Sequence, residues 1–200
     1  EWDREGTFPM EAYQKAFSLG FHKMELPKEN GGLGMDYVTV SAVLEEIGKY
    51  DAGFATSMMS CSLAMKPILL FGDEAQKQRA CDLIVPGGFA GFCLTEPETG
   101  TDVGALTATA IKDGDDYIIN AHKRFCTSGK YASVYTVFAN AHPELGAKGL
   151  CAFMVEAGLP GMTIGKEEDK MGIRTSSVCD VIFEDVRVPA SSLLSGEGMG

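Results

Sequence analysis

The 200-residue sequence has few basic residues and lacks any long apolar run. Lysine and arginine number 17, against 28 aspartates and glutamates, which gives a net charge of −11 at pH 7. Nucleic-acid binding needs a basic face, so this composition argues against that class of function. No uninterrupted apolar stretch approaches the roughly 18–20 residues of a membrane span, so we expect no membrane-spanning helix.

Metal-ligating residues are also scarce. The chain has three histidines, and none of its six cysteines forms a Cys-x-x-Cys pair. This spacing argues against a zinc site, and we predict no metal. A chain of this size can bury a core without disulfide staples, so we expect free, buried thiols.

Residues 1–88 have the pattern of an all-helical domain. Apolar residues at helical spacing predict helices near residues 10–20, 40–48, 54–67 and 73–85. We expect Pro67 to kink or end its helix. Asp73 followed by Gln76 predicts a capping box at the start of the last one. The breaker run 86–88, Pro-Gly-Gly, marks the expected domain boundary.

Residues 89–200 have the pattern of a strand domain. Short segments rich in β-branched and aromatic residues predict strands near 89–94, 105–111, 117–120, 123–127, 134–139, 151–155, 162–165 and 178–186. The acidic run 113–116 predicts a hairpin turn. No helix-length pattern separates the strands, so we expect an antiparallel sandwich or barrel. The expected fold class is therefore α+β, with an all-helical domain at 1–88 and a β-domain at 89–200.

Residues 92–104, FCLTEPETGTDVG, carry the most informative motif. A predicted strand ends near Leu94, and the chain then turns through Pro97 and Gly100, with threonine hydroxyls beside free backbone N–H groups. Such a loop can pair with phosphate or ring oxygens of a ligand without a countercharge. A threonine-rich turn whose hydroxyls cap its own backbone has the same pattern. The residues alone leave both alternatives open.

A second motif is residues 123–129, KRFCTSG. Phe125 and Thr127 stand two apart on a predicted strand and so share one face, where they could stack on and hydrogen-bond to a flat cofactor. An ordinary strand end fits the same pattern. The motif becomes specific only together with others along the chain.

Taken in order, these motifs resemble those of the acyl-CoA dehydrogenase family. Residues 92–105 are similar to its Ser/Thr-Glu…Gly-Ser/Thr-Asp signature, and Thr99 departs from it because the family prefers a smaller residue there. Further segments match in order, namely 27–34 (PKENGGLG), 117–129 (YIINAHKRFCTSG), 170–176 (KMGIRTS) and 183–189 (FEDVRVP). The resemblance spans essentially the whole chain.

The resemblance implies a fold of three parts, of which this chain matches the N-terminal helical domain and the middle β-domain. The C-terminal four-helix domain is absent, and in the family it holds the catalytic glutamate and most of the subunit interface. The sequence also starts at Glu1 rather than at methionine. We therefore expect a segment of a longer chain, inactive alone, whose full-length form is a homo-oligomer, a homotetramer or a dimer.

The resemblance also implies a site for FAD. Carried over by motif, the cofactor-binding residues are Phe92, Leu94, Thr95, Gly100, Thr101, Phe125 and Thr127. Thr95 is expected near the pyrimidine end of the flavin and Thr127 at its N5 edge. Phe125 stands where the family usually has Trp, which keeps an aromatic surface and loses an indole N–H. Thr101 is also expected to bind the acyl-CoA substrate, through its pantetheine. No catalytic residue is assigned, and Glu96 is expected to structure the loop.

The implied activity is FAD-dependent α,β-dehydrogenation of an acyl-CoA thioester. A glutamate base outside this segment removes the α-proton as hydride leaves Cβ for flavin N5, and the electrons pass to an electron-transfer flavoprotein. Two alternatives stay open, an O₂-using family oxidase (an acyl-CoA oxidase or a nitroalkane oxidase) and a non-catalytic paralogue. The implied location is cytoplasmic, or the mitochondrial matrix in a eukaryote.

Overall fold

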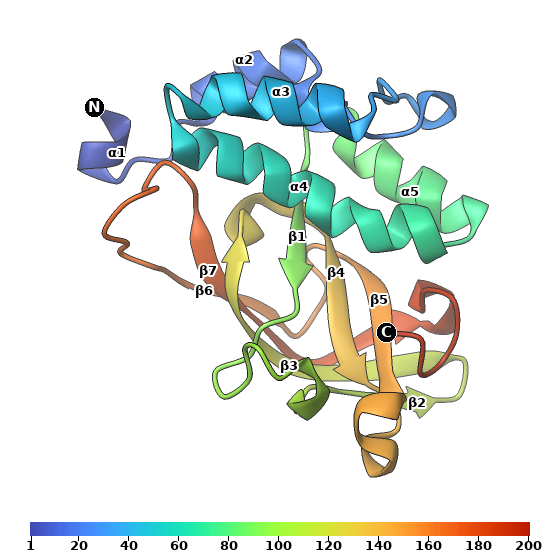
Figure 1. The fold of residues 1–200 in the computed structure, drawn as a ribbon. Helices are drawn as coiled ribbons and strands as arrows, with labels where there is room; N and C mark the ends of the chain where they lie inside the picture. Colours follow the sequence, from blue (N-terminus) through green and yellow to red (C-terminus); the bar gives the residue numbers. More distant parts are fainter.

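A layer of helices lies over a β-sheet (Figure 1). The computed structural model describes all 200 residues. The helices are α1 (Trp2–Glu5), α2 (Met10–Ser18), α3 (Tyr37–Gly48), α4 (Ala52–Phe71) and α5 (Glu74–Ile84). The strands are β1 (Phe89–Cys93), β2 (Thr109–Asp113), β3 (Asp116–Thr127), β4 (Ala132–Asn140), β5 (Leu150–Glu156), β6 (Met162–Glu167) and β7 (Val178–Pro189). The predicted order, helical domain and then strand domain, is confirmed.

Aspartate side chains begin the three longest helices. Asp36 accepts a hydrogen bond from the Thr39 backbone N–H at 2.9 Å, and Asp51 accepts one from Phe54 at 2.8 Å. These carboxylates satisfy N–H groups that the first turn of a helix leaves free. Asp73 and Gln76 form the predicted capping box at the start of α5.

Helix α4 does not end at Pro67 but continues through it to Phe71. In the turn before the proline, the buried Thr136 hydroxyl of β4 donates to the Ala64 carbonyl at 2.7 Å, which ties this segment to the sheet. By length and composition α4 could also cross a membrane. The sequence analysis did not predict this, because polar residues interrupt the apolar run. Core helices meet the same criteria, and α4 buries Met58, Cys61, Met65 and four other side chains in addition to a glycine.

The strands form one hydrogen-bonded sheet of seven, in the order β1-β4-β2-β3-β7-β6, with β5 pairing to β4. Most pairs are antiparallel as expected, but β1 and β4 run parallel, and β2 meets β4 in parallel at one residue pair. The expected antiparallel pairing therefore holds for most of the sheet, and the parallel pairing of β1 with β4 departs from it. A long loop and the β2–β3 hairpin connect β1 to β4. Strand β4 can therefore run in the same direction as β1 without a crossover α-helix between them.

Three predicted strands, 105–111, 117–120 and 123–127, differ in extent from the observed ones. The segments 117–120 and 123–127 belong to one strand, β3, which is interrupted only by irregularities in its pairing with β7. Strand β2 begins at Thr109, four residues later than predicted, because residues 103–105 form a 3₁₀ turn. The hairpin turn is as predicted, with Asp113 facing Asp116 and Gly114 at φ 62°.

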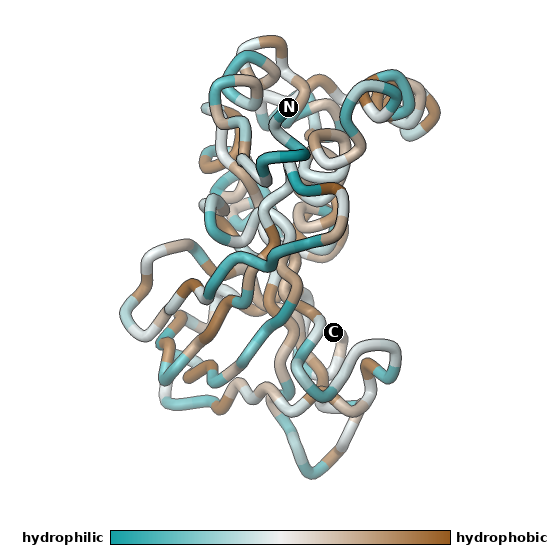
Figure 2. Tube along the Cα trace, turned by 90° about the vertical axis from the view of Figure 1, so that its left-hand side faces the viewer, coloured by the Kyte–Doolittle hydropathy of each residue, from teal (hydrophilic) through white to brown (hydrophobic).

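The apolar core has two large parts, one inside the sheet and one between the sheet and the helices. The first contains 19 buried residues and the second 13. Strand β4 contributes to both, because Tyr135 and Val137 face the sheet interior while Val134 faces α4 and α5. Hydrophobic segments run through the junction of the two layers in Figure 2. Burial of both faces of β4 accounts for its nearly continuous apolar sequence.

A buried polar chain joins the helical layer to the loop before β7. The Tyr13 hydroxyl donates to the Thr175 carbonyl at 3.1 Å, and the Thr175 hydroxyl donates to Asp51 at 2.5 Å. Gly53, in the first turn of α4, faces the same threonine. A Cβ atom at Gly53 would lie 2.1 Å from the Thr175 Oγ1 atom. Only glycine therefore lets α4 approach this loop so closely.

We predict that Gly53→Ala lowers the free energy of unfolding by about 1–3 kcal/mol, because the added methyl group overpacks this contact. Gly48→Ala is the matched control, since its Cβ would meet only Ala55, at 3.9 Å. That change is expected to be neutral or to stabilise by up to about 1 kcal/mol, through helix propensity. Chemical denaturation of both variants tests this. Equal effects of the two changes would contradict the close approach.

Candidate functional site

The loop of residues 94–107, which we call the site loop, is held closed by Glu96. The Glu96 carboxylate accepts hydrogen bonds from the Thr107 N–H and hydroxyl, both at 2.7 Å, and from the Ala108 N–H at 3.0 Å. The Thr99 hydroxyl donates to the Ala105 carbonyl at 3.2 Å. These bonds join the start of the loop to its end, which is the loop-structuring role expected for Glu96.

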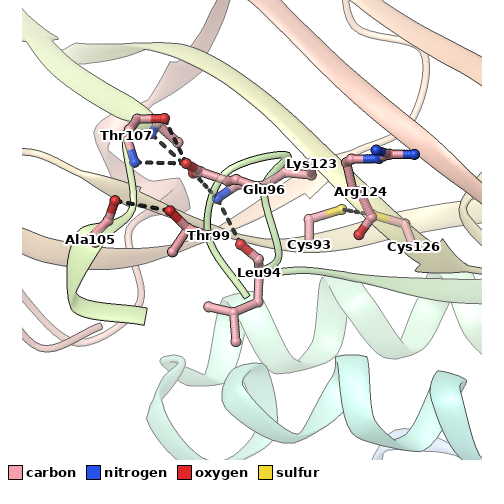
Figure 3. Close-up of polar contacts among 10 residues, drawn as sticks. Cys93, Leu94, Glu96, Thr99, Ala105, Thr107, Lys123, Arg124 and Cys126 are labelled. Atoms are coloured by element: carbon pink, nitrogen blue, oxygen red, sulfur yellow. Dashed lines mark hydrogen bonds and ion pairs between the residues drawn. The ribbon is translucent and has the colours of Figure 1, made fainter. Parts of the chain in front are cut away.

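Lys123 on β3 reaches the same carboxylate (Figure 3). Its Nζ atom lies 2.7 Å from Glu96 Oε1 and 3.1 Å from the Leu94 carbonyl oxygen. Lys123 is 0% exposed and Glu96 is 4% exposed. The Leu94 side chain points away from this pair (Figure 3). One buried ammonium group therefore fixes both the first residue of the site loop and the carboxylate that closes it.

Burial and pairing act on the pKa values of both groups. Burial lowers the pKa of Lys123, although the ion pair with Glu96 opposes the shift. Burial tends to raise the pKa of Glu96, but the hydrogen bonds from Lys123 and Thr107 outweigh it and hold the pKa below its ordinary value. Glu96 is therefore an ionised carboxylate whose lone pairs are already used.

Strand β3 changes face immediately after Lys123. Tyr117, Ile119 and Lys123 all point into the sheet core, as a regular alternation requires. The pairing with β7 then gains one residue between Lys123 and Cys126, which is a β-bulge. Phe125 sits in the bulge at φ 56°, and its side chain is 56% exposed. Cys126 is buried instead, so the half-buried Thr127 lies on the outer side of the strand.

The end of β1 lies against this bulge. The Arg124 N–H donates to the Thr95 carbonyl at 2.7 Å, and the Sγ atoms of Cys93 and Cys126 are 3.4 Å apart inside the core. The residues that flank these two cysteines point away from the sheet core. Phe92 and Leu94 on one segment, and Phe125 and Thr127 on the other, are thereby brought to neighbouring positions. Phe92 is half-buried and packs edge-on against Phe138, with ring centroids 5.3 Å apart.

The threonine hydroxyls around the site loop fall into two groups. Those of Thr99 and Thr107 are used within the loop, as a self-capping turn requires. Those of Thr95, Thr101 and Thr127 make no hydrogen bond within the chain, and Thr101 is exposed. The three unused hydroxyls are the ones that the sequence motif assigns to ligand binding. This division favours ligand binding over an internal cap for these three residues.

Nothing in the structure of the chain itself requires a glycine at position 100. Its φ lies outside the left-handed region, and a Cβ atom placed on it would meet nothing within 4 Å. Any residue could therefore occupy this turn as far as the chain itself is concerned. A side chain there would instead obstruct a molecule that approaches the exposed backbone of the loop.

Sequence reasoning gives no role to Lys123, although this residue lies within the 117–129 motif. A signal for it exists, because Lys123 falls on the inward side of a strand whose other inward residues are apolar. Of the other groups, all six cysteines are free and buried, as expected. Burial raises the pKa of the Cys179 thiol to about 12. No group of three or more His, Cys, Asp or Glu side chains is placed to hold a metal ion.

Two family models match the chain over nearly its whole length. The acyl-CoA dehydrogenase N-terminal domain matches residues 1–87, and the acyl-CoA dehydrogenase middle domain matches residues 91–186. The chain belongs to the acyl-CoA dehydrogenase family. The motif resemblance drawn from the sequence is therefore confirmed.

Several known proteins of this family are similar along the whole chain. The human mitochondrial short-chain specific acyl-CoA dehydrogenase is 41% identical over 99% of this chain and 48% of its own length. The structure of butyryl-CoA dehydrogenase from Megasphaera elsdenii is 40% identical, with a TM-score of 0.94 over 100% of this chain and 54% of its own. A chain in a structure that describes the electron transferring flavoprotein of Acidaminococcus fermentans is 40% identical, with a TM-score of 0.95, over 100% and 53%. The chain thus spans about half the length of these relatives.

We predict that Glu96→Gln lowers the free energy of unfolding at pH 7 by about 3–5 kcal/mol, because it leaves the Lys123 ammonium buried without a counter-charge. Glu96 has a lowered pKa in the folded protein, so its contribution is complete above the ordinary value of 4.5 and is lost as the pH falls through the folded value. Denaturation of wild type and variant between pH 7 and about pH 2 should show a constant difference down to pH 4.5 and a shrinking one below it.

Glu156→Gln is the control for this experiment. It removes a partly exposed ion pair with Arg79 and should cost at most about 1 kcal/mol. A wild-type advantage over Glu96→Gln that stays constant down to the lowest pH would show that Glu96 does not carry the buried charge.

Proposed function

We propose that the full-length protein containing this chain is an FAD-dependent acyl-CoA dehydrogenase. It oxidises the Cα–Cβ bond of an acyl-CoA thioester and passes the electrons to an electron-transfer flavoprotein. The observation that carries the proposal is family membership across both domains, with relatives named as short-chain specific and butyryl-CoA dehydrogenases. We further propose that residues 1–88 and 89–200 are its first two domains and that the full-length form is a homotetramer or a dimer.

The residues around the site loop are suited to hold FAD. The support is the set of hydroxyls on Thr95, Thr101 and Thr127 that no group of the chain uses, together with an exposed aromatic ring at Phe125. We assign Thr127 to the N5 edge of the flavin, Thr95 to its pyrimidine end and Phe125 to its ring face. Phe92 and Leu94 would line the ring. The backbone of Gly100 and Thr101 would meet the pyrophosphate side.

FAD, when bound, supplies the hydride acceptor for this chemistry. The role of residues 1–200 would be to bind the cofactor and the acyl-CoA and to orient them. Thr101 would hold the pantetheine arm of the acyl-CoA by its exposed hydroxyl and N–H. The ring of Phe125 would exclude water from the site, with the Arg124 guanidinium 4.7 Å from its centre. Each of these roles needs a fixed position of the site loop against the β3 bulge.

The base that takes the α-proton is not assigned to this chain. Glu96 lies next to the site in sequence, but its oxygens already accept bonds from Lys123, Thr107 and Ala108, and its pKa is lowered. A general base needs a free lone pair and a pKa near the working pH. We propose that the base is a glutamate outside residues 1–200, and that the protein works in the cytoplasm or, in a eukaryote, in the mitochondrial matrix.

We predict that the full-length protein purifies with bound FAD and oxidises butyryl-CoA. The flavin absorbance should bleach on addition of substrate and recover with an electron-transfer flavoprotein or an artificial acceptor. The measurement is acceptor reduction and peroxide release under air. Acceptor-independent peroxide release would instead indicate an oxidase, and retained FAD without any bleaching a non-catalytic relative. The isolated 1–200 segment is the control, expected to show no turnover because the base is missing.

We predict that Thr101→Val weakens FAD retention and acyl-CoA affinity together in the full-length protein. Loss of the hydroxyl leaves a ligand group unpaired, at about 1–3 kcal/mol, which is roughly a 5- to 150-fold weakening. The matched control is Thr99→Val, whose hydroxyl bonds to the Ala105 carbonyl, so its effect should be a lower melting temperature with both affinities intact. If Thr101→Val behaves like this control, the site assignment is wrong while the family assignment stands.

A further inference from the structure

The segment that carries Leu94 and Thr95 has no place in the strand ladder. The last ladder pair of β1 joins Cys93 to Val137 of β4, and the chain leaves β4 at that point. Beyond it, the Leu94 carbonyl accepts only the Lys123 ammonium, and the Thr95 carbonyl accepts the Arg124 N–H. Lys123 and Arg124 of β3 therefore hold the backbone of the site loop at its first two residues.

We propose that Lys123 is a positioning residue for the cofactor site. By binding the Leu94 carbonyl and the Glu96 carboxylate at once, its ammonium group holds Leu94 and Thr95 beside Phe125 and Thr127. This inference rests on the proposed function, because those four residues are assigned there to FAD. Lys123 touches neither cofactor nor substrate and acts only through the two segments that it joins.

The presence of a charged lysine at the buried position 123 supports a positioning role. The groups that face Lys123 are the Glu96 carboxylate, the Leu94 carbonyl and the thiols of Cys93 and Cys126. A well-packed apolar pair can replace a buried ion pair without loss of stability, so stability alone does not require lysine here. An ammonium group offers what an apolar side chain cannot, several donors that satisfy acceptors on two parts of a loop at once.

A second ion pair in the chain gives a matched comparison. Arg79 of α5 binds Glu156 of β5 through two hydrogen bonds of 2.7 Å each. It also joins two elements that are distant in sequence, yet it is partly exposed and touches no residue of the site loop. Its loss should affect the link between helix and sheet without moving Leu94 or Thr95.

The test uses the full-length holoenzyme with three variants, Lys123→Met, the double change Glu96→Gln/Lys123→Met, and Arg79→Met. In the double variant the amide oxygen at position 96 can still accept from the Thr107 N–H and hydroxyl, which use one carboxylate oxygen of Glu96. The amide nitrogen replaces the other oxygen, so the bond from the Ala108 N–H, both charges and the bridge to Leu94 are gone. Melting temperature, FAD dissociation constant and the visible circular dichroism of bound flavin are measured on each. The first reports stability and the other two report the geometry of the site.

Lys123→Met should lower the melting temperature and weaken FAD binding. The double variant should recover part of the melting temperature, because no unpaired charge is left in the core while the bond to the Ala108 N–H is lost. Its FAD dissociation constant should nevertheless stay about tenfold above that of the wild type, the effect of losing one bridging hydrogen bond, and its flavin circular dichroism should stay altered. Arg79→Met should leave both flavin readouts unchanged.

Recovery of FAD affinity and of the flavin spectrum along with the melting temperature in the double variant would overturn the proposal, since Lys123 would then be merely structural. An equal loss of FAD affinity in Arg79→Met would overturn it as well. A wild-type protein that holds no FAD is a different result, because it would refute the proposed function itself.

Discussion

The geometry of the site depends on the buried ion pair between Lys123 and Glu96. It joins β3 to the loop that follows β1, and these segments share no ladder at this point. The carboxylate holds the far end of the loop through Thr107, and the ammonium holds the near end through Leu94. Because removal of either partner leaves a charge in the core, neither half of the pair can be lost without destabilising the loop.

The β-bulge at Phe125 gives the candidate site its outward-facing side chains on β3. In a regular strand Phe125 and Thr127 would share the inward face of Lys123, and both would be lost to the core. The extra residue turns them outward and places Cys126 inward, against Cys93. A second irregularity, at Asp185 with φ 51°, adjusts β7 to the same partner strand and is held by two hydrogen bonds with Asn120. Backbone irregularity thus decides which side chains a ligand can reach.

Short-range features of this fold follow from the sequence, and long-range ones do not. The capping box at Asp73 and the hairpin turn at 113–116 depend on residues within a few positions, and the sequence predicts them. The parallel pairing of β1 with β4, the bulge and the contact of Lys123 with Glu96 depend on residues that meet only in the folded chain. The motif residues were found through family resemblance, whereas the distinction between used and unused threonine hydroxyls needed the structure.

The site loop has a further consequence for how ligands reach it. Lys123 neutralises Glu96, but residues 94–107 also contain Glu98 and Asp102 and neither lysine nor arginine, on a chain with a net charge of −11. FAD and acyl-CoA, the ligands proposed above, both carry phosphate groups, so the long-range field of this segment would oppose their approach. In the proposed site, binding would rely on hydroxyls and N–H groups that act only at contact distance. Added salt would therefore speed the encounter by screening repulsion, the opposite of its effect on electrostatically steered sites.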